Sequence, residues 1–270
     1  MGLTNNESGL NVLRENFNVE EDTPVVAFAG NPNTGKSTVF NSLTGLKQHT
    51  GNWPGKTVTQ AQGYCNYQGQ QLTLVDLPGT YSLLANSEEE RIARDFICFA
   101  QPDATVVVVD ATNLERNLNL VLQVMELTDN VILCLNLMDE AERKNIEVDV
   151  QRLEERLQIP VIPTVAIEEV GFEKLKETAV KIVNDNLQVN PATIEYSEEV
   201  EDKVEELIPQ LKSIWEPWEG KINLRWLALR LLEGDETVLE SLDKYYFQTL
   251  SQNKEINAKS EVAADEVLRG

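Results

Sequence analysis

The stretch GNPNTGKS at residues 30–37 constrains the fold of this chain more than any other feature. It fits the pattern G-x-x-x-x-G-K-S, it follows the apolar run VVAFA, and a helical spacing of apolar residues begins at Lys36. A strand, a glycine-rich turn and a helix in this order form a phosphate-binding loop, in which backbone N–H groups and the positive end of the helix face phosphate oxygens. We therefore expect Lys36 to reach the β- and γ-phosphates of a nucleotide and the Ser37 hydroxyl to bind Mg²⁺.

Apolar runs alternate with helical patterns over the first two thirds of the chain. Strands are expected at residues 25–29, 58–67, 71–75, 105–110, 131–136 and 160–165, and helices at 36–46, 88–99, 114–127, 148–157 and 173–183. Buried strands that alternate with helices predict an α/β fold with a mainly parallel sheet flanked by helices.

The pattern changes after about residue 184. Residues 184–193 are typical of a linker, and the remainder shows helical spacing at 200–215, 224–233 and 236–251 without a strand-like run. We therefore divide the chain into a polar N-terminal extension (1–23, with a short helix around 10–17), an α/β nucleotide-binding domain (24–184) and a small all-helical domain (185–270).

The second motif is DLPG at residues 76–79, directly after the predicted strand 71–75. A carboxylate at a strand end beside a phosphate-binding loop suits Mg²⁺, usually through a water molecule. We therefore expect Asp76 to serve the metal, and the Gly79 N–H to bond the γ-phosphate and to sense its loss.

The third motif is NLMD at residues 136–139, at the end of another buried strand. A carboxylate there accepts two hydrogen bonds from guanine N1 and N2, a donor pair that adenine lacks, so Asp139 would select guanine. Asn136 is expected to bond the base edge and to brace the phosphate-binding loop. Leu137 stands where the usual guanine signature has a lysine; a leucine still covers a base face, and weaker guanine binding is expected.

The segment HTGNWPGKTVT at residues 49–59 lies between the first helix and the second strand. In proteins that switch on GTP, such a segment supplies a threonine that binds Mg²⁺ and the γ-phosphate. Thr57 and Thr59 both qualify, and the glycines and proline suit a loop with more than one conformation. Trp53 is either a lid over the nucleotide or an anchor on the surface.

Residues that are missing also limit the function. No glutamine follows Gly79, where many GTPases use one to orient water, so hydrolysis is expected to be slow or differently organised. With 23 Lys and Arg against 45 Asp and Glu, the net charge of −22 argues against a nucleic-acid partner. One histidine and three scattered cysteines nearly exclude a zinc site and fit reduced thiols. No apolar run is long enough to span a membrane, and we expect the chain itself to be soluble.

Four stretches together resemble the N-terminal cytoplasmic G-protein domain of the bacterial ferrous iron transporters of the FeoB family. They are GNPNTGKSTVFNSLTG, GNWPGKTVT, DLPGTYSL and NLMD, and GNWPG is the most specific of them. The resemblance covers residues 24–183 and implies a P-loop GTPase fold. By position and helical pattern, the segment behind it is similar to the family's helical domain, which acts like a guanine-nucleotide dissociation inhibitor.

The resemblance implies further roles. Thr57 would be the switch threonine, with Thr59 the less favoured choice, and Asn33 would help to hold an activating K⁺ beside the phosphates in place of an arginine finger. The TVAI stretch that starts at Thr164 falls where the family has a Ser-Ala-type guanine loop, and without the serine it would touch the base through backbone groups.

Lys36, Thr57, Asn33 and Gly79 are thus the expected catalytic residues, with Ser37, Thr57 and Asp76 for Mg²⁺ and Asn33 for K⁺. The expected nucleotide-binding residues are Gly30, Asn31, Pro32, Asn33, Thr34, Gly35, Lys36, Ser37, Thr38, Gly55, Lys56, Thr57, Asp76, Leu77, Pro78, Gly79, Asn136, Leu137, Met138, Asp139, Thr164, Val165 and Ala166.

The leading hypothesis is a slow Mg²⁺-dependent GTPase that switches with the γ-phosphate and regulates a ferrous iron permease. The alternative is a nucleotide-sensing module that gates a pore by binding GTP or GDP rather than by turnover, and an RNA- or ribosome-associated GTPase is disfavoured by the charge. The family's membrane transport domain would follow the helical domain and is not in this chain, which would lie at the cytoplasmic face of the bacterial inner membrane. The sequence leaves the oligomeric state open.

Overall fold

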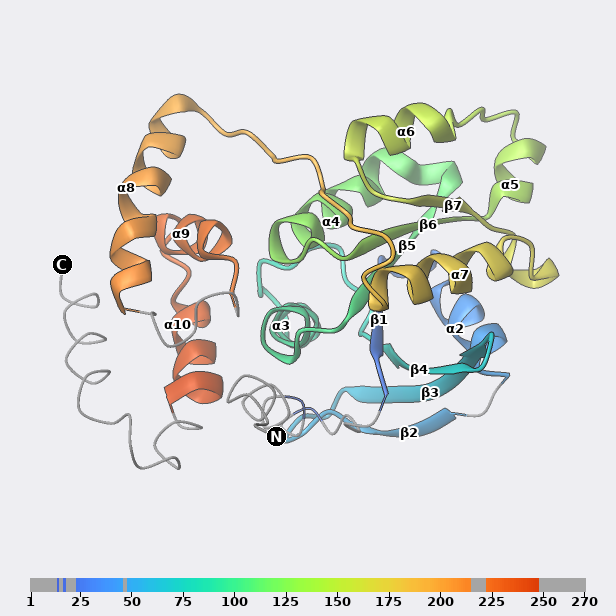
Figure 1. The fold of residues 1–270 in the computed structure, drawn as a ribbon, viewed down its shortest axis with the longest axis horizontal. Coiled ribbons are helices and arrows are strands. Elements are labelled where there is room, and N and C mark those ends of the chain that lie inside the picture. The colour runs from blue at the N-terminus through green and yellow to red at the C-terminus, as the bar shows by residue number, and fades with distance from the viewer. Residues whose placement is uncertain (1–13, 15–16, 18–22, 46–47, 215–221, 248–270) are drawn as a thin grey trace. The chain divides into compact units, whose positions relative to one another are not determined.

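The computed structural model describes residues 14, 17, 23–45, 48–214 and 222–247. The chain forms two compact units, one of residues 17–194 and one of residues 195–270 together with 1–16. The larger unit holds the sheet and the smaller one is helical in its described part (Figure 1).

A seven-stranded sheet in the order β2-β3-β4-β1-β5-β6-β7 is the frame of the larger unit (Figure 1). Its strands are β1 (Val25–Gly30), β2 (Gln48–Asn52), β3 (Thr59–Tyr67), β4 (Gln70–Asp76), β5 (Ala104–Asp110), β6 (Val131–Asn136) and β7 (Val161–Pro163). The five strands from β4 to β7 in this order are parallel, and β2, β3 and β4 pair antiparallel.

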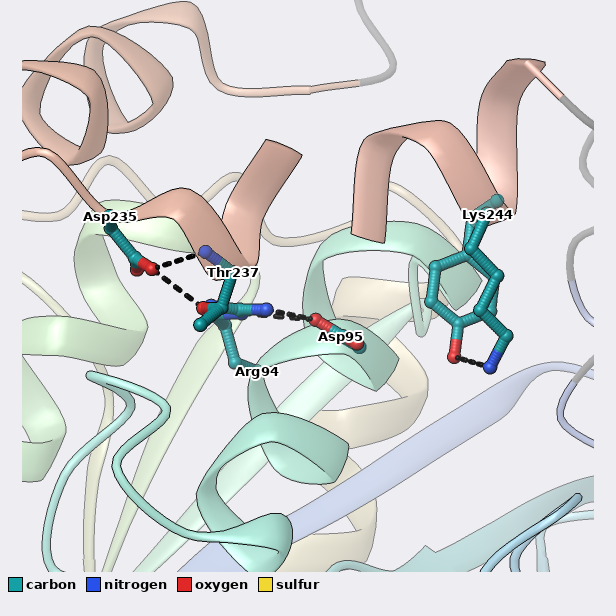
Figure 2. A network of polar contacts seen from close by, with 6 residues as sticks. Arg94, Asp95, Asp235, Thr237 and Lys244 are labelled. Atoms are coloured by element: carbon teal, nitrogen blue, oxygen red, sulfur yellow. Dashed lines mark hydrogen bonds and ion pairs between the residues drawn. The ribbon is translucent and has the colours of Figure 1, made fainter. Parts of the chain in front are cut away.

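Helices flank the sheet, as the alternating pattern predicts. They are α2 (Lys36–Thr44), α3 (Glu88–Asp95), α4 (Leu114–Leu127), α5 (Met138–Arg143), α6 (Val150–Leu157) and α7 (Phe172–Val183), with the short turns η1 (Phe96–Ala100), η2 (Ala111–Asn113) and η3 (Ala166–Glu168). The π-helical turn η1 continues α3 directly. At this junction the neighbours Arg94 and Asp95 form a buried ion pair with an N–O distance of 2.7 Å (Figure 2).

The core lies along the central parallel strands. Every residue of β1 and β6 is buried, as is all of β5 except Asp110, because these strands carry apolar side chains on both faces. Parallel strands end at the same edge of a sheet, so Gly30, Asp76 and Asn136 come to one edge. The register agrees, since Phe28 pairs with Asp76 and Asp110 pairs with Asn136.

The described part of the helical unit contains α8 (Glu198–Ile214), α9 (Leu224–Leu232), α10 (Glu236–Leu242) and the turn η5 (Asp243–Phe247). The Asp235 carboxylate caps α10 by accepting a hydrogen bond from the Thr237 backbone N–H (Figure 2). Between α8 and α9, both carboxylate oxygens of Glu201 accept bonds from Arg225 at 2.6 and 2.8 Å. These bonds lower the pKa of Glu201 to about 2.

The structure adds one strand and one α-helix that the sequence pattern does not predict, β2 and α5. The helix expected around residues 10–17 lies outside the described residues except for Arg14 and Phe17, and so do the expected helix ends at 215 and 248–251. The linker predicted at residues 184–193 contains no helix or strand, and this stretch continues to residue 197. None of the helices in the described part is both long and apolar enough to span a membrane.

Candidate functional site

The GNPNTGKS loop joins β1 to α2 in the geometry of a phosphate-binding loop. Asn33 (φ 69°) and Gly35 (φ 82°) both adopt the left-handed conformation, which turns the loop back onto the start of α2. A Cβ on Gly35 would lie 2.3 Å from the Asn136 amide nitrogen, so only glycine fits there. Asn31, Thr34 and Lys36 are buried, whereas Pro32, Asn33, Ser37 and Thr38 are exposed.

The Lys36 ammonium forms an ion pair with Asp76 at the end of β4 and donates to the Leu77 carbonyl at 2.6 Å. Burial raises the pKa of the Asp76 carboxyl, and the nearby Lys36 partly offsets this effect. Lys36, which is predicted to reach the phosphates, is therefore paired with Asp76, which is predicted to bind Mg²⁺. A nucleotide would have to draw Lys36 away from Asp76.

The DLPG turn runs along the phosphate-binding loop. The Leu77 N–H donates to the Phe28 carbonyl at 2.9 Å, and the Thr80 N–H donates to the Gly30 carbonyl at 3.2 Å. A Cβ on Gly79 would lie 3.6 Å from Pro32, which places the turn in near contact with the loop. The DLPG turn, whose Gly79 N–H is predicted to sense the γ-phosphate, is thus hydrogen-bonded to the phosphate-binding loop.

Asn136 connects the phosphate-binding loop to the neighbouring loop after β7. Its side chain is fully buried, and its amide nitrogen donates to the Thr34 carbonyl at 2.9 Å, which is the predicted brace. Its amide oxygen accepts from the Thr164 hydroxyl at 3.2 Å and from the Ala166 N–H at 3.1 Å. Sequence reasoning assigned the TVAI stretch backbone contacts to a base, and it missed the role of the Thr164 hydroxyl.

Asp139 lies in the first turn of α5, a helix that begins directly after Leu137 (φ 62°). One carboxylate oxygen is 3.6 Å from Arg143, and the other is buried and has no hydrogen-bond partner among the described residues. A buried carboxylate oxygen without a partner is costly unless a donor arrives. The site therefore offers an acceptor for a ligand N–H at the position predicted for guanine.

The loop after β7 is closed by two backbone hydrogen bonds of 3.2 Å between Val165 and Val170. The Met138 N–H also donates to the Thr164 carbonyl at 3.3 Å, so this loop and the NLMD segment are held side by side. Ile167 lies within the closed loop with 76% of its surface exposed. Backbone closure and the Thr164 hydroxyl thus fix this loop beside Asn136.

The segment with the predicted switch threonine lies on α3. Thr57 and Lys56 both contact the Glu88 carboxylate, with Thr57 Oγ1 at 3.5 Å and Lys56 Nζ at 3.1 Å. Trp53 is only 2% exposed and packs edge-on against Phe96, with ring centroids 5.5 Å apart. Trp53 is therefore a core anchor and neither a lid nor a surface anchor.

The donor set fits magnesium bound with a nucleotide. No cluster of three or more His, Cys, Asp or Glu suited to a metal occurs within the described ranges. Mg²⁺ in nucleotide sites uses one or two protein oxygens and the phosphates, and it needs no such cluster. The exposed Ser37 hydroxyl follows Lys36, whose ammonium already touches Asp76, so a hydroxyl and a carboxylate are available at the same edge.

Comparison with known proteins gives consistent matches along the chain. A family model described as ferrous iron transport protein B matches residues 24–179, and one described as the FeoB cytosolic helical domain matches residues 196–269. The Fe(2+) transporter FeoB of Escherichia coli strain K12 is 40% identical over 215 residues, which are 78% of this chain and 27% of that protein. The chain thus spans about a quarter of the length of such curated relatives.

Solved structures agree over nearly the whole chain. The cytosolic domain of the T. maritima FeoB iron transporter in a GDP form has a TM-score of 0.73 and 33% identity, covering 92% of this chain and 97% of that one. Its GMPPNP form has a TM-score of 0.72, with 32% identity and coverage of 92% and 98%. The cytosolic domain of L. pneumophila FeoB has a TM-score of 0.73, with 32% identity and coverage of 91% and 95%. The chain belongs to the ferrous iron transport protein B family, and it carries the P-loop GTPase-type G domain of that family followed by its helical domain.

Proposed function

We propose that this chain binds GTP and GDP and hydrolyses GTP slowly, with Mg²⁺ as cofactor. The carrying observation is the buried Asn136 side chain, which joins the phosphate-binding loop to the guanine loop next to Asp139. The GDP and GMPPNP forms of the T. maritima relative support a guanine nucleotide as the ligand.

Base selection follows from the donors and acceptors at Asp139. Guanine N1–H and N2–H would donate to the carboxylate and give its buried oxygen a partner. Adenine has an acceptor at N1, so the same oxygen would stay unpaired, which costs about 1–3 kcal/mol. Leu137 and the loop of Thr164, Val165 and Ala166 would cover the base.

Hydrolysis would proceed by in-line attack of water on the γ-phosphate. Lys36 would leave Asp76, donate to the β- and γ-phosphate oxygens and neutralise part of their charge. Ser37 and Thr57 would ligate Mg²⁺ and Asp76 would hold one of its waters, and the metal when bound supplies charge neutralisation on the same oxygens. Loss of the γ-phosphate would free Thr57 and the Gly79 N–H. The segment of residues 49–59 and the DLPG turn would then be free to move.

Slow turnover would follow from the residue after Gly79, which is Thr80 and not a glutamine. The Thr80 hydroxyl is occupied by the Ser82 carbonyl at 2.6 Å, so this side chain is not available to orient the water. We propose that a K⁺ held by the exposed amide of Asn33 supports the reaction by adding positive charge beside the phosphates. The same observation at Thr80 favours the second candidate function, a module that senses nucleotide by binding alone.

We further propose that the chain is the regulatory part of a longer ferrous iron transporter, at the cytoplasmic face of the bacterial inner membrane, where its own transport domain is the partner. The support is the family membership and the transporter relatives. The G domain would span residues 24–184, behind an extension of residues 1–23. Residues 185–270 would act on nucleotide release like a dissociation inhibitor.

The test is GTP turnover in KCl against NaCl at equal ionic strength with Mg²⁺ present. Faster turnover in KCl, lost in Asn33→Ala, supports the hydrolase with its K⁺ site. Equal slow rates in both salts remove K⁺ from the mechanism. Tight binding of GTP without any turnover would favour the sensing module.

A further inference from the structure

Glu88, the first residue of α3, is contacted by two side chains from the segment that precedes β3. The Lys56 ammonium lies 3.1 Å from one carboxylate oxygen, and the Thr57 hydroxyl lies 3.5 Å from the other. Ser87 caps the helix by accepting the Glu90 N–H at 3.1 Å, so the position of Glu88 is fixed by a formed helix start. The positive end of the helix dipole favours a negative side chain at this first position of α3.

The base of this segment is fixed on both sides, and we call the part between, residues 54–58, the switch tip. On one side Trp53 is buried between the rings of Phe17 and Phe96, at centroid distances of 6.3 and 5.5 Å. On the other side β3 begins at Thr59. The Trp53 backbone N–H donates to the Val58 carbonyl at 2.9 Å and closes the tip at its base. A rearrangement that keeps these anchors would therefore be confined to five residues.

We propose that Glu88 is a positioning residue that holds the switch tip on α3 when no γ-phosphate is present. This inference rests on the proposed function, in which Thr57 ligates Mg²⁺ in the triphosphate state. Thr57 Oγ1 cannot follow the metal while its hydroxyl and its neighbour Lys56 are held by Glu88. Binding of GTP would therefore have to break both contacts, whereas binding of GDP would leave them in place.

The strength of these contacts suits a reversible switch. The Lys56 and Glu88 side chains are 29% and 39% exposed, and ion pairs with this exposure are weak because water competes for both partners. Such a pair biases the equilibrium by a small factor, and ligand binding overcomes it easily. We expect it to lower the affinity for a triphosphate by about two- to fivefold relative to the diphosphate.

The experiment compares the Kd of GMPPNP with the Kd of GDP, both with Mg²⁺, in the full chain. Glu88→Gln should tighten GMPPNP about two- to fivefold and leave the Kd of GDP and the melting temperature unchanged. Glu89→Gln is the matched control, because Glu89 lies in the same first turn of α3 and is exposed. Lys56→Gln should act in the same direction, and the double variant should gain less than the sum of the two.

Thr57→Ala separates failure of this inference from failure of the proposed function. If Thr57→Ala weakens GMPPNP but Glu88→Gln leaves the ratio of the two Kd values unchanged, Glu88 does not position the tip. If Thr57→Ala leaves GMPPNP binding unchanged, Thr57 is not the metal ligand and the inference falls with that assignment. Retention of the wild-type ratio in Glu88→Asp, beside the shift in Glu88→Gln, would support the role of the charge.

Discussion

The two halves of the candidate site are built differently. In the phosphate and base half, the side chains that link the loops are buried and bonded within the protein, since Asn136 is fully buried and Lys36 is 8% exposed. The switch tip is half-buried to exposed, and a partly exposed ion pair to Glu88 holds it. One half is organised before any ligand arrives, and the other is held by contacts that a ligand can replace.

This difference assigns separate tasks to the two halves. A ligand shifts a conformational equilibrium only as far as its affinities for the two states differ. Apart from the Lys36 contact with the γ-phosphate, the buried half would meet the same base and the same β-phosphate in GTP and GDP, so most of its affinity is common to both. The conformational response to the γ-phosphate would come from the switch tip and the Gly79 backbone, which contact only the γ-phosphate end.

Replacing Trp53, which anchors the switch tip in the core, should have the largest effect of the changes considered, and the effect is on stability. Trp53→Ala should lower the free energy of unfolding by about 3–5 kcal/mol, because it leaves a large cavity against Phe17 and Phe96. Trp53→Phe should cost far less, since the indole N–H has no hydrogen-bond partner among the described residues. Urea unfolding followed by circular dichroism measures both. Equal, small losses would show that the segment is not anchored in the core.

Loss of the phosphate-binding cation should come next. Lys36→Ala should weaken GTP by at least about 100-fold, because it removes two charge-assisted hydrogen bonds that are each worth about 1.5–3 kcal/mol. It should weaken GDP by at least about 10-fold, because GDP offers Lys36 only the β-phosphate. Calorimetric titration measures the two Kd values, with the exposed Lys174→Ala as control. A variant that binds GTP normally would refute the role of this loop.

Replacing Asp139 should lower the affinity for guanine nucleotides strongly and leave the affinity for adenine nucleotides unchanged. Asp139→Asn should weaken GTP by about 30- to 100-fold, because the amide offers one acceptor where the carboxylate offers two. It should leave the weak binding of ATP unchanged and favour xanthosine triphosphate, whose 2-oxygen accepts from the new N–H₂ group. An unchanged preference of GTP over ATP contradicts the assignment of Asp139.

The smallest effect compares two buried threonines. Thr164→Val removes one of the two donors to the Asn136 oxygen and should weaken GDP about fivefold, which corresponds to about 1 kcal/mol. Thr105→Val should leave GDP binding and stability unchanged or slightly improve stability, because its buried hydroxyl has no partner in the described part. Equal effects of the two changes in GDP titrations would argue against Asn136 as a specific link.

Much of the buried half could be predicted from the sequence. The apolar strands and the motifs at their ends are local patterns, and parallel pairing brings Gly30, Asp76 and Asn136 to one edge without further information. The brace from Asn136 to Thr34 follows from the same arrangement. The family resemblance stated from these motifs is confirmed by the family models.

The contacts of the switch tip and two short elements, β2 and α5, could not be predicted in the same way. The polar strand β2 has no alternation of apolar residues, and it exists because its backbone pairs with β3. Helix α5 has only six residues, too few to show helical periodicity. The contacts of Glu88 reach 31 and 32 residues back along the chain, and no spacing rule connects an acidic helix start to a distant lysine and threonine.

Hydrogen exchange with GDP, GMPPNP and an ATP analogue tests the division of the site most directly. Residues 30–37 and 136–139 should gain protection with either guanine nucleotide and little with the ATP analogue. Residues 54–58 should change their protection only with GMPPNP. Equal changes at 54–58 with GDP and GMPPNP, or equal protection of 136–139 by the ATP analogue, would contradict the account.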